Sequence, residues 1–242
     1  MLLRFFGYLF GIGAVFFILI AGGVAWYINE QSADLPNYEV LNRYEPPVMT
    51  RIHASDGALM AEYARERRLF LPSQAIPDLV KAAFLSAEDK NFYHHNGIDP
   101  TGIARAVAVN IENLLGGWQR RPVGASTITQ QVAKNFLLTN DQNIKRKVQE
   151  MLISLRMETA FSKEKILELY LNEIYLGLGA YGIGAASLVY FDKSVNELTL
   201  AEAAYLAALP KGPANYHPFN SKEKAITRRN WVIDRMVENG LI

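Results

Sequence analysis

The chain begins with a long apolar run and then changes to apolar and polar positions that alternate with helical spacing. Residues 5–28, FFGYLFGIGAVFFILIAGGVAWYI, contain no charged side chain. As a helix this run would extend about 36 Å, enough to cross a hydrocarbon core of about 30 Å. A cleavable signal peptide has a shorter apolar region, about 7 to 15 residues long. The run therefore predicts an uncleaved transmembrane signal anchor over residues 5–28.

Charges on either side of the apolar run predict its orientation. Arg4 and the amino terminus precede it, whereas Glu30 and Asp34 follow it. Positively charged flanks stay in the cytoplasm. We expect residues 1–4 in the cytoplasm and residues 29–242 on the periplasmic or extracellular side of the cytoplasmic (inner) membrane.

Two segments separate the anchor from the helical part of the chain. Residues 29–47 are polar, contain prolines and show no clear period, which predicts a linker. Residues 48–72 form a β-like segment, because the turn signal Ser-Asp-Gly at 55–57 lies between two short strand-like runs. Residues 67–71 could add a third strand.

From residue 76 onward the apolar spacing is helical. Thr127 and Gln130 have the spacing of a capping box, and Gly240 is a helix stop signal. One helix carries apolar residues at the spacing of a buried face, namely Val148, Met151, Leu152 and Leu155. We expect helices over residues 76–89, 99–115, 125–138, 144–161, 162–176, 199–209 and 222–239. The fold class is therefore mainly α, in a domain over residues 48–242 with a small β element at its start.

Composition excludes only a few further classes of function and of site. The net charge of +1 gives no overall basicity that would point to nucleic acid. The chain has no cysteine, so disulfides and thiolate metal sites are excluded.

The first polar cluster is EDKNFYHH, residues 88–95. Glu88 and Asp89 end an apolar helix, and the polar run continues past Phe92. This density of polar groups beside aromatic rings predicts the wall of a cleft, although a solvated helix end is the simpler alternative. Metal ligation is disfavoured, because the adjacent His94 and His95 rarely bring both rings to one ion.

The second cluster is GASTITQQVAKN, residues 124–135. Its hydroxyl residues Ser126 and Thr127 begin a helix, where free backbone N–H groups and the helix dipole can hold an anion. Pairs of polar side chains at i, i+4 then share faces: Gln130 with Lys134, and Gln131 with Asn135. An ordinary capped helix with exposed polar residues is the alternative.

The third cluster is RKVQE, residues 146–150. Arg146, Lys147 and Glu150 can share one helix face, which Ser154 and Glu158 extend. The simpler interpretation is an exposed face with ion pairs, each worth a few tenths of a kcal/mol. The functional one is a carboxylate kept ionised beside cations that also hold phosphate.

These stretches together resemble a known family. EDKNFYHHNGIDP is similar to E-D-x-x-F-x-x-H-x-G, RKVQE matches R-K-x-x-E, and GASTITQQVAKN and KILELYLNEIYLG match two further motifs in the same order. The chain resembles the peptidoglycan glycosyltransferase module (glycosyltransferase family 51) of class A penicillin-binding proteins. The flanks SDGALMAEY and ALPKGPANYHPFN look most like type 1A members, and less like monofunctional transglycosylases.

The resemblance implies a lysozyme-like, mainly helical fold with a cleft near the membrane. It implies polymerisation of lipid II into β-1,4 glycan strands, with Glu88 as general base and Glu150 as second essential carboxylate. It also implies that the remaining motif positions bind substrate or shape the site: Asp89, Phe92, His95, Ser126, Thr127, Gln130, Gln131, Lys134, Asn135, Arg146 and Lys147. The implied partners are lipid II, the nascent glycan strand, membrane lipid and other cell-wall synthesis proteins.

The residues fit this chemistry on their own terms. An α-linked diphosphate donor that gives a β bond requires attack with inversion, and the attacking hydroxyl needs a base such as a carboxylate. The leaving diphosphate needs charge stabilisation, which Lys134, Arg146 and Lys147 could supply. A glycosidase would instead need an acid and a water, so the cations favour transfer over hydrolysis. A lysozyme-like hydrolase and a non-catalytic scaffold stay as alternatives.

Three further points stay open in the sequence. No cofactor is certain, although a divalent cation, Mg²⁺ or Mn²⁺, could bridge the diphosphate and the carboxylates. Residues 113–122, NLLGGWQRRP, mix Leu114, Leu115 and Trp118 with arginines and predict a mobile loop at the membrane surface or lipid tail; an ordinary surface loop is the alternative. The type 1A flanks suggest that a transpeptidase domain follows in a longer, bifunctional parent protein.

Overall fold

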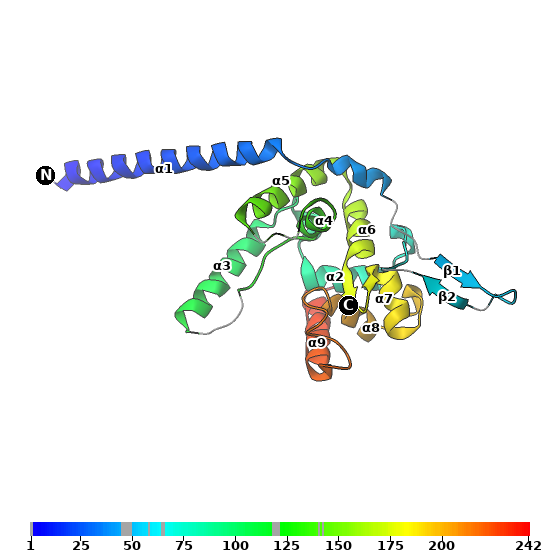
Figure 1. Ribbon diagram of the computed structural model, residues 1–242. Helices are drawn as coiled ribbons and strands as arrows, with labels where there is room; N and C mark the ends of the chain where they lie inside the picture. The colour runs from blue at the N-terminus through cyan, green and yellow to red at the C-terminus, as the bar shows by residue number, and fades with distance from the viewer. Residues whose placement is uncertain are drawn as a thin grey trace.

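The computed structural model describes residues 2–44, 50–57, 59–63, 66–117, 122–139, 141 and 143–242. A helical body carries three projections: the long helix α1, the helix α3 and a β-hairpin (Figure 1). The mainly α class predicted from the sequence is confirmed.

Helix α1 (Leu2–Ala33) leaves the body as a straight rod, and the amino terminus lies far from the other elements (Figure 1). Phe10–Ala33 is long and apolar enough to cross a membrane, and its most apolar part is not buried inside the protein. The polar Gln31 near its end is buried. The helix therefore runs five residues past the predicted end at residue 28. The polar side chains of residues 29–33 do not stop it, because a helix ends at a backbone or capping signal rather than at a change of polarity.

The segment predicted as an irregular linker is ordered over the part that the structure describes. After α1, residues Tyr38–Arg43 form the 3₁₀ helix η1, with Asn37 as its cap. Leu41 of η1 is only 2% exposed and belongs to the core. The ring of Tyr44 packs edge-on against Phe136 at 4.7 Å. These apolar anchors explain why a polar stretch without period still adopts a fixed path.

The β segment forms two separate sheets. Strands β1 (Thr50–His53) and β2 (Leu59–Tyr63) pair antiparallel, as the turn signal predicted. The third strand, β3 (Arg67–Arg68), is shorter than predicted and pairs instead with β5 (Ala180–Tyr181), next to β4 (Tyr175–Gly177). Beyond β3, the backbone of Leu71 bonds to the side-chain amide of Asn172, which replaces a strand partner.

All seven predicted helices are present within the described residues. Thr127 caps its helix as expected, and Ser162 and Thr199 likewise accept a hydrogen bond from the first turn of theirs. The helical elements after β3 are η2 (Ser73–Ala75), α2 (Asp78–Glu88), η3 (Phe92–His94), α3 (Pro100–Leu115), α4 (Ile128–Leu137), α5 (Ile144–Ala160), α6 (Lys163–Glu173), α7 (Gly182–Phe191), η4 (Val195–Glu197), α8 (Leu200–Ala208) and α9 (Lys222–Glu238).

Helix α7 was missed by the sequence pattern. Its residues Gly182–Ser187 are all buried, so no polar face alternates with an apolar one. A helix that is buried all round has no amphipathic period to detect.

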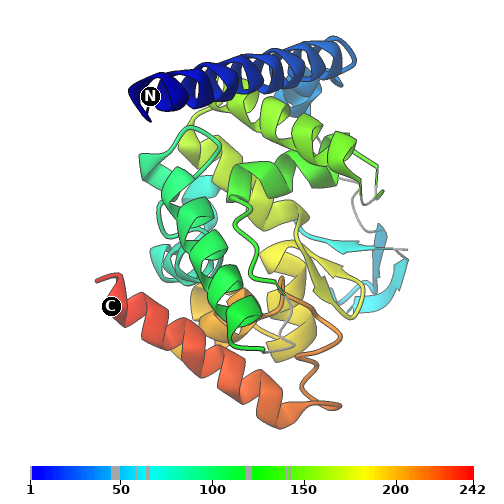
Figure 2. The same cartoon turned by 90° about the vertical axis from the view of Figure 1, so that its left-hand side faces the viewer.

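Two groups of helices meet in the body. Helix α8 contacts both α2 and α9, whereas α4 contacts α5 and α6 (Figure 2). The carboxyl end of α2 and the amino end of α4 are joined by hydrogen bonds described below. This junction positions the candidate site.

Helix α5 contradicts the predicted orientation of its faces. Of the expected apolar face, Val148, Met151 and Leu152 are only partly buried, and Leu155 is 41% exposed. The residues buried in α5 are Glu150, Ile153, Ser154 and Met157. The polar side chains can face inward because ion pairs and hydrogen bonds satisfy them, while the apolar row turns toward α1.

Candidate active site

Asp89 connects the end of α2 to the start of α4. It is 6% exposed, and its Oδ2 accepts a hydrogen bond from the backbone N–H of Ile128 at 3.0 Å. Thr127 and Gln130 form the predicted capping box at the same helix start. The N–H groups of Ile128 and Gln130 are therefore occupied by Asp89 and Thr127. These two N–H groups are therefore not free for a ligand, because the carboxylate of Asp89 already lies at this helix start.

His95 holds Asp89 from the other side. Its Nε2 lies 3.0 Å from Asp89 Oδ2, while its Nδ1 accepts a hydrogen bond from the backbone N–H of Gly97 at 3.1 Å. Because Nδ1 accepts, the ring proton lies on Nε2 and is donated to Asp89. Both ring nitrogens are thus engaged, which leaves His95 no lone pair for a metal ion. His94 is exposed.

Gly97 brings this loop onto α5 and α4. Its carbonyl accepts a hydrogen bond from Thr127 Oγ1 at 2.7 Å. Its φ is +87°, and an added Cβ would lie 2.8 Å from the backbone of Ser154. Only glycine fits such a contact without strain. Lys163 fixes the same loop, since its Nζ donates to the carbonyl of His95 at 2.6 Å.

Phe92 contributes to this scaffold rather than to an open surface. It is fully buried, and its ring packs edge-on against the ring of His95 at 6.2 Å. The Nζ of Lys163 lies 4.4 Å from the centre of the Phe92 ring. Asp89, Phe92 and His95 therefore hold the backbone around Glu88, as the sequence analysis allowed for residues that shape the site.

Glu88 is the last residue of α2 and is partly buried. Gln131 Nε2 donates a hydrogen bond to its Oε2 at 2.9 Å. Burial raises the pKa of Glu88 above its usual value, while the Gln131 hydrogen bond and the charges of Arg228 and Lys211 act in the opposite direction. The buried hydroxyl of Tyr170 has no hydrogen-bond partner within the described residues; burial, and then the charge of Glu88, raises its pKa.

Glu150 lies in a different environment. Its side chain is 3% exposed, Arg146 Nη1 lies 3.0 Å from its Oε2, and Lys147 Nζ pairs with its Oε1. Lys147 Nζ also donates to Ser126 Oγ at 2.9 Å, and it lies 3.5 Å from Gln130 Oε1. The buried Nε of Arg146 has no acceptor among the residues that the structure describes.

The continuation of this helix face is buried too. Ser154 is fully buried, and Glu158 Oε1 accepts hydrogen bonds from Thr129 Oγ1 and Lys163 Nζ at 2.5 and 2.8 Å. The simpler interpretation of the third cluster, an exposed face with ion pairs, is therefore contradicted.

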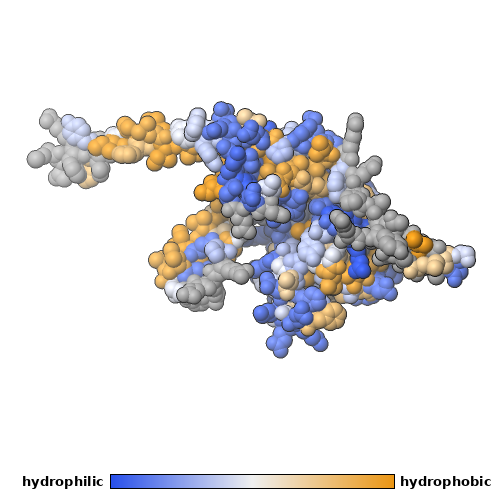
Figure 3. All heavy atoms as spheres, in the orientation of Figure 1, coloured by the Kyte–Doolittle hydropathy of each residue, from blue (hydrophilic) through white to orange (hydrophobic). Residues whose placement is uncertain are grey.

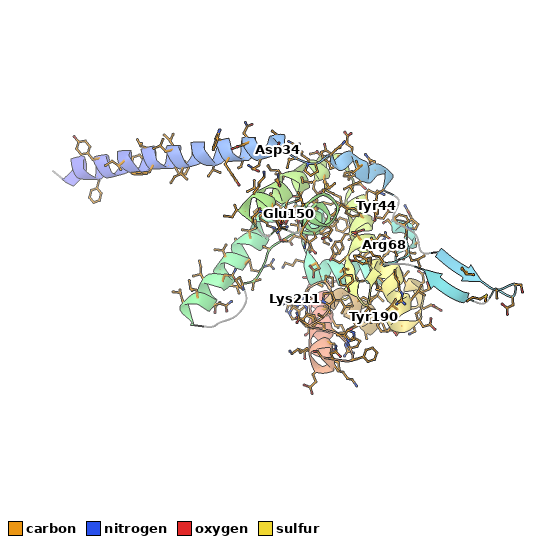
Figure 4. All side chains as sticks on the ribbon, viewed as in Figure 1. Asp34, Tyr44, Arg68, Glu150, Tyr190 and Lys211 are labelled. Atoms are coloured by element: carbon orange, nitrogen blue, oxygen red, sulfur yellow. The ribbon has the colours of Figure 1, made fainter. Side chains whose placement is uncertain are left out.

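Neighbouring glutamines of α4 connect the two carboxylates to one helix. Gln131 binds Glu88, whereas Gln130 faces Lys147, the partner of Glu150. Lys134 and Asn135, one turn further along α4, are exposed. Figure 3 shows a hollow between the arm formed by α3 and the body, and Glu150 and Lys211 lie on the side of the body that faces this arm (Figure 4).

The sequence analysis missed two cations near Glu88. Lys211 follows α8, and Arg228 lies on α9; removal from solvent lowers the pKa of each, and Glu88 opposes the shift in both. The guanidinium of Arg228 stacks 3.6 Å from the centre of the Trp231 ring. The sequence signal for these two cations was weak, because Lys211 is a single lysine in the proline-rich stretch ALPKGPANYHPFN that follows a strongly apolar helix.

A metal site and a membrane loop were considered at the sequence level. The described residues contain no group of three or more His, Asp or Glu side chains that could hold a metal ion. Involvement of Mg²⁺ or Mn²⁺ stays a prediction. In the predicted loop at 113–122, Leu114 and Leu115 are 80% and 81% exposed, but Trp118 and both arginines lie outside the described residues.

Comparison with known proteins identifies the family. The family model described as "Transglycosylase" matches residues 56–237. The chain belongs to the transglycosylase family. The matched range contains Glu88, Glu150, Lys211 and Arg228, so the whole candidate site lies inside the transglycosylase domain.

Relatives of this transglycosylase domain are penicillin-binding proteins 1A. The one from Rickettsia bellii is 51% identical over 95% of this chain and 29% of its own length. Those from Aquifex aeolicus and Escherichia coli K12 are 47% and 42% identical over 86% and 97% of this chain, and over 28% and 26% of their own lengths. The chain thus spans less than a third of the length of these relatives.

A solved structure, penicillin-binding protein 1A from Haemophilus influenzae, aligns at 27% identity with a TM-score of 0.43. The alignment covers 82% of this chain and 19% of that one.

Proposed function

We propose that the protein is a membrane-anchored peptidoglycan glycosyltransferase that polymerises lipid II into β-1,4 glycan strands with inversion, releasing the polyprenyl diphosphate. The observation that carries the proposal is the unlike environment of two carboxylates held by one helix. Glu88 has an amide partner and a raised pKa, whereas Glu150 is bound to two cations. Membership of the transglycosylase family supports the same chemistry.

Glu88 is suited to act as general base. A carboxylate with a raised pKa holds a proton more firmly than an ordinary one, which favours proton abstraction from a sugar hydroxyl. It would take the proton of the acceptor's 4-hydroxyl while that oxygen attacks C1 of the donor sugar. The bond from C1 to the diphosphate oxygen breaks as the new C1–O bond forms, and its electron pair leaves with the diphosphate.

The Glu150 side is suited to hold the leaving diphosphate. The buried Nε of Arg146 has no acceptor among the described residues, and Lys147 Nζ lies beside Ser126 just before α4. Preorganised cations stabilise charge that develops in the transition state without further rearrangement. Glu150 fixes both cations in place, and the exposed Lys134 on α4 could add a third positive charge.

The position of the anchor fits a lipid-linked substrate. We propose that Phe10–Ala33 spans the cytoplasmic membrane with the amino terminus in the cytoplasm, so that the transglycosylase domain lies on the outer face. Helix α1 then confines enzyme and lipid II to one surface. This raises their local concentration without any additional contact.

The product of the reaction tests the proposal. The full chain in detergent or vesicles should convert lipid II into glycan strands that a muramidase degrades to disaccharide units. Purified peptidoglycan incubated with the same protein should release no muropeptides. Release of muropeptides without strand synthesis would establish the hydrolase alternative. The absence of both products would favour a non-catalytic scaffold. Repeating strand synthesis with EDTA, then with Mg²⁺ or Mn²⁺ restored, tests for a divalent cation.

A further inference from the structure

Helices α1 and α5 pack against each other (Figures 1 and 2). Side chains of the two helices line a groove. Arg156 near the end of α5 donates from Nη2 to Ser32 Oγ at 2.6 Å, which fixes the end of α1 to the body. The groove has a volume of about 580 Å³. Its walls include Ile20, Val24 and Ile28 from α1, and Ile144, Val148 and Met151 from α5.

The groove walls are apolar side chains that the protein itself leaves uncovered. Ile20 and Val24 are 64% and 53% exposed, and Ile144 is 77% exposed. An uncovered apolar surface of this kind marks an interaction site. Since the lining part of α1 lies within Phe10–Ala33, the surface faces lipid rather than water if that segment spans the membrane. The occupant should therefore be a hydrocarbon chain.

The other faces of the same turns of α5 carry the charged residues of the candidate site. Arg146, Lys147 and Glu150 alternate along the helix with Ile144, Val148 and Met151. One helical turn is about 5.4 Å long, so a phosphate bound at Arg146 lies within a turn of the groove along the axis. A ligand that fits both surfaces has an anionic head joined directly to a long apolar chain.

We propose that the α1–α5 groove binds the polyprenyl chain of the lipid-diphosphate donor, while Arg146 and Lys147 hold its diphosphate. This inference rests on the proposed function and adds that α1 is part of the substrate site. The donor is favoured over the acceptor because the groove adjoins the cations at Glu150 rather than the base Glu88. An ordinary phospholipid acyl chain is the competing occupant.

Gly23 gives a direct test. It lines the groove, and a Cβ added there meets no atom within 4 Å, so a larger side chain would extend into free space. Gly22 is the matched control: it is the neighbouring glycine of α1, has equally open surroundings and does not line the groove. Leucine at either position keeps α1 apolar and helical.

The experiment compares Gly23→Leu and Gly22→Leu in vesicles, each with two substrates: long-chain lipid II and a water-soluble short-chain analogue. We expect Gly23→Leu to slow polymerisation of long-chain lipid II about tenfold or more, because the new side chain takes the place of part of the polyprenyl chain. Its rate with the short-chain analogue, which does not reach the groove, should equal that of the wild type. Gly22→Leu should match the wild type with both substrates.

Each other outcome has a definite meaning. Equal rates for the two variants on long-chain lipid II would overturn the proposal and leave the groove to bulk phospholipid. Equal slowing of Gly23→Leu on both substrates would also overturn it, because the substitution would then act on the chemistry. If the wild type polymerises neither substrate, it is the proposed function that fails.

Discussion

Glu88 and Glu150 differ in almost every property except their residue type. Glu88 ends a helix, has one amide donor among the residues that the structure describes and is affected by cations only at a distance, and burial raises its pKa. Glu150 lies inside a helix, is 2% exposed and is paired directly with Arg146 and Lys147. Under the proposed function, Glu88 accepts a proton, whereas Glu150 holds two cations in place.

The two environments also predict different effects of substitution on the free energy of unfolding. A buried carboxylate without an ion-pair partner costs folding free energy, because its charge is poorly solvated. A carboxylate between two cations is costly to remove, because its partners are left uncompensated. The two sites should therefore respond in opposite ways to the same substitution, Glu to Gln.

The largest effect is expected from Glu88→Gln. Loss of the general base should reduce polymerisation about 10²- to 10⁴-fold. The free energy of unfolding should stay the same or rise, because an amide fills the site without a charge. Strand synthesis from lipid II and denaturation of the purified protein measure the two quantities. A rate within tenfold of the wild type would show that Glu88 is not the base.

Glu150→Gln should lower the free energy of unfolding by about 3 kcal/mol, at the low end for a broken buried pair because Lys147 is 43% exposed. Urea denaturation in detergent provides the measurement. Glu238→Gln is the control, since it breaks an i, i+3 pair with Arg235 that is largely exposed and should cost only a few tenths of a kcal/mol. Equal costs for the two variants would place Glu150 among ordinary surface ion pairs.

The loop that joins the two carboxylate environments can be tested at Gly97. Gly97→Ala should destabilise the protein by about 2 kcal/mol or more, because it combines a positive φ with a Cβ placed 2.8 Å from the backbone of Ser154. Gly240→Ala has a similar φ of +68° but open surroundings, so it should cost less. Thermal unfolding of both variants separates backbone strain from the clash. Equal costs would mean that α5 does not pack closely on this loop.

The smallest expected effect is a shift in the acidic side of the pH dependence of kcat/KM. Glu88 must be ionised to accept a proton, and its raised pKa means that kcat/KM should begin to fall at a higher pH than for an ordinary glutamate. Gln131→Leu removes the donor that stabilises the ionised form, so its acid limb should move to still higher pH. An acid limb that does not respond to Gln131 would assign the titration to another group.

Local pattern predicted seven of the α-helices and the polar and charged clusters that they carry. The capping box at Thr127, the helix over residues 144–161 and the carboxylate between Arg146 and Lys147 all depend on neighbours within one helical turn. Such relations are fixed by the helical repeat and hold in any fold that keeps the helix. The hairpin at 55–57 is equally local.

The errors share one cause, which is contact between distant segments. The apolar face of α5 was assigned to the core, but it faces α1, while polar partners from α4 and α6 bury the opposite face. The group that occupies the Ile128 N–H at the start of α4 is Asp89, 39 positions earlier in the chain, which no local pattern could indicate. Helix α7 gave no signal because it is buried on all sides.

The sequence alone determined that a long apolar segment precedes a mainly helical domain, and it placed both carboxylates on helices, because these properties follow from composition and short-range period. Only the tertiary structure decided that the ion pairs of Glu150 are buried and that Glu88 has a raised pKa. Burial and charge depend on what other elements bring: Gln131 from α4, Arg228 from α9 and Lys211 from the loop after α8. The groove also depends on tertiary structure, because its two walls come from segments far apart in the sequence. Ser32 and Arg156, whose contact joins the two segments, are 124 positions apart.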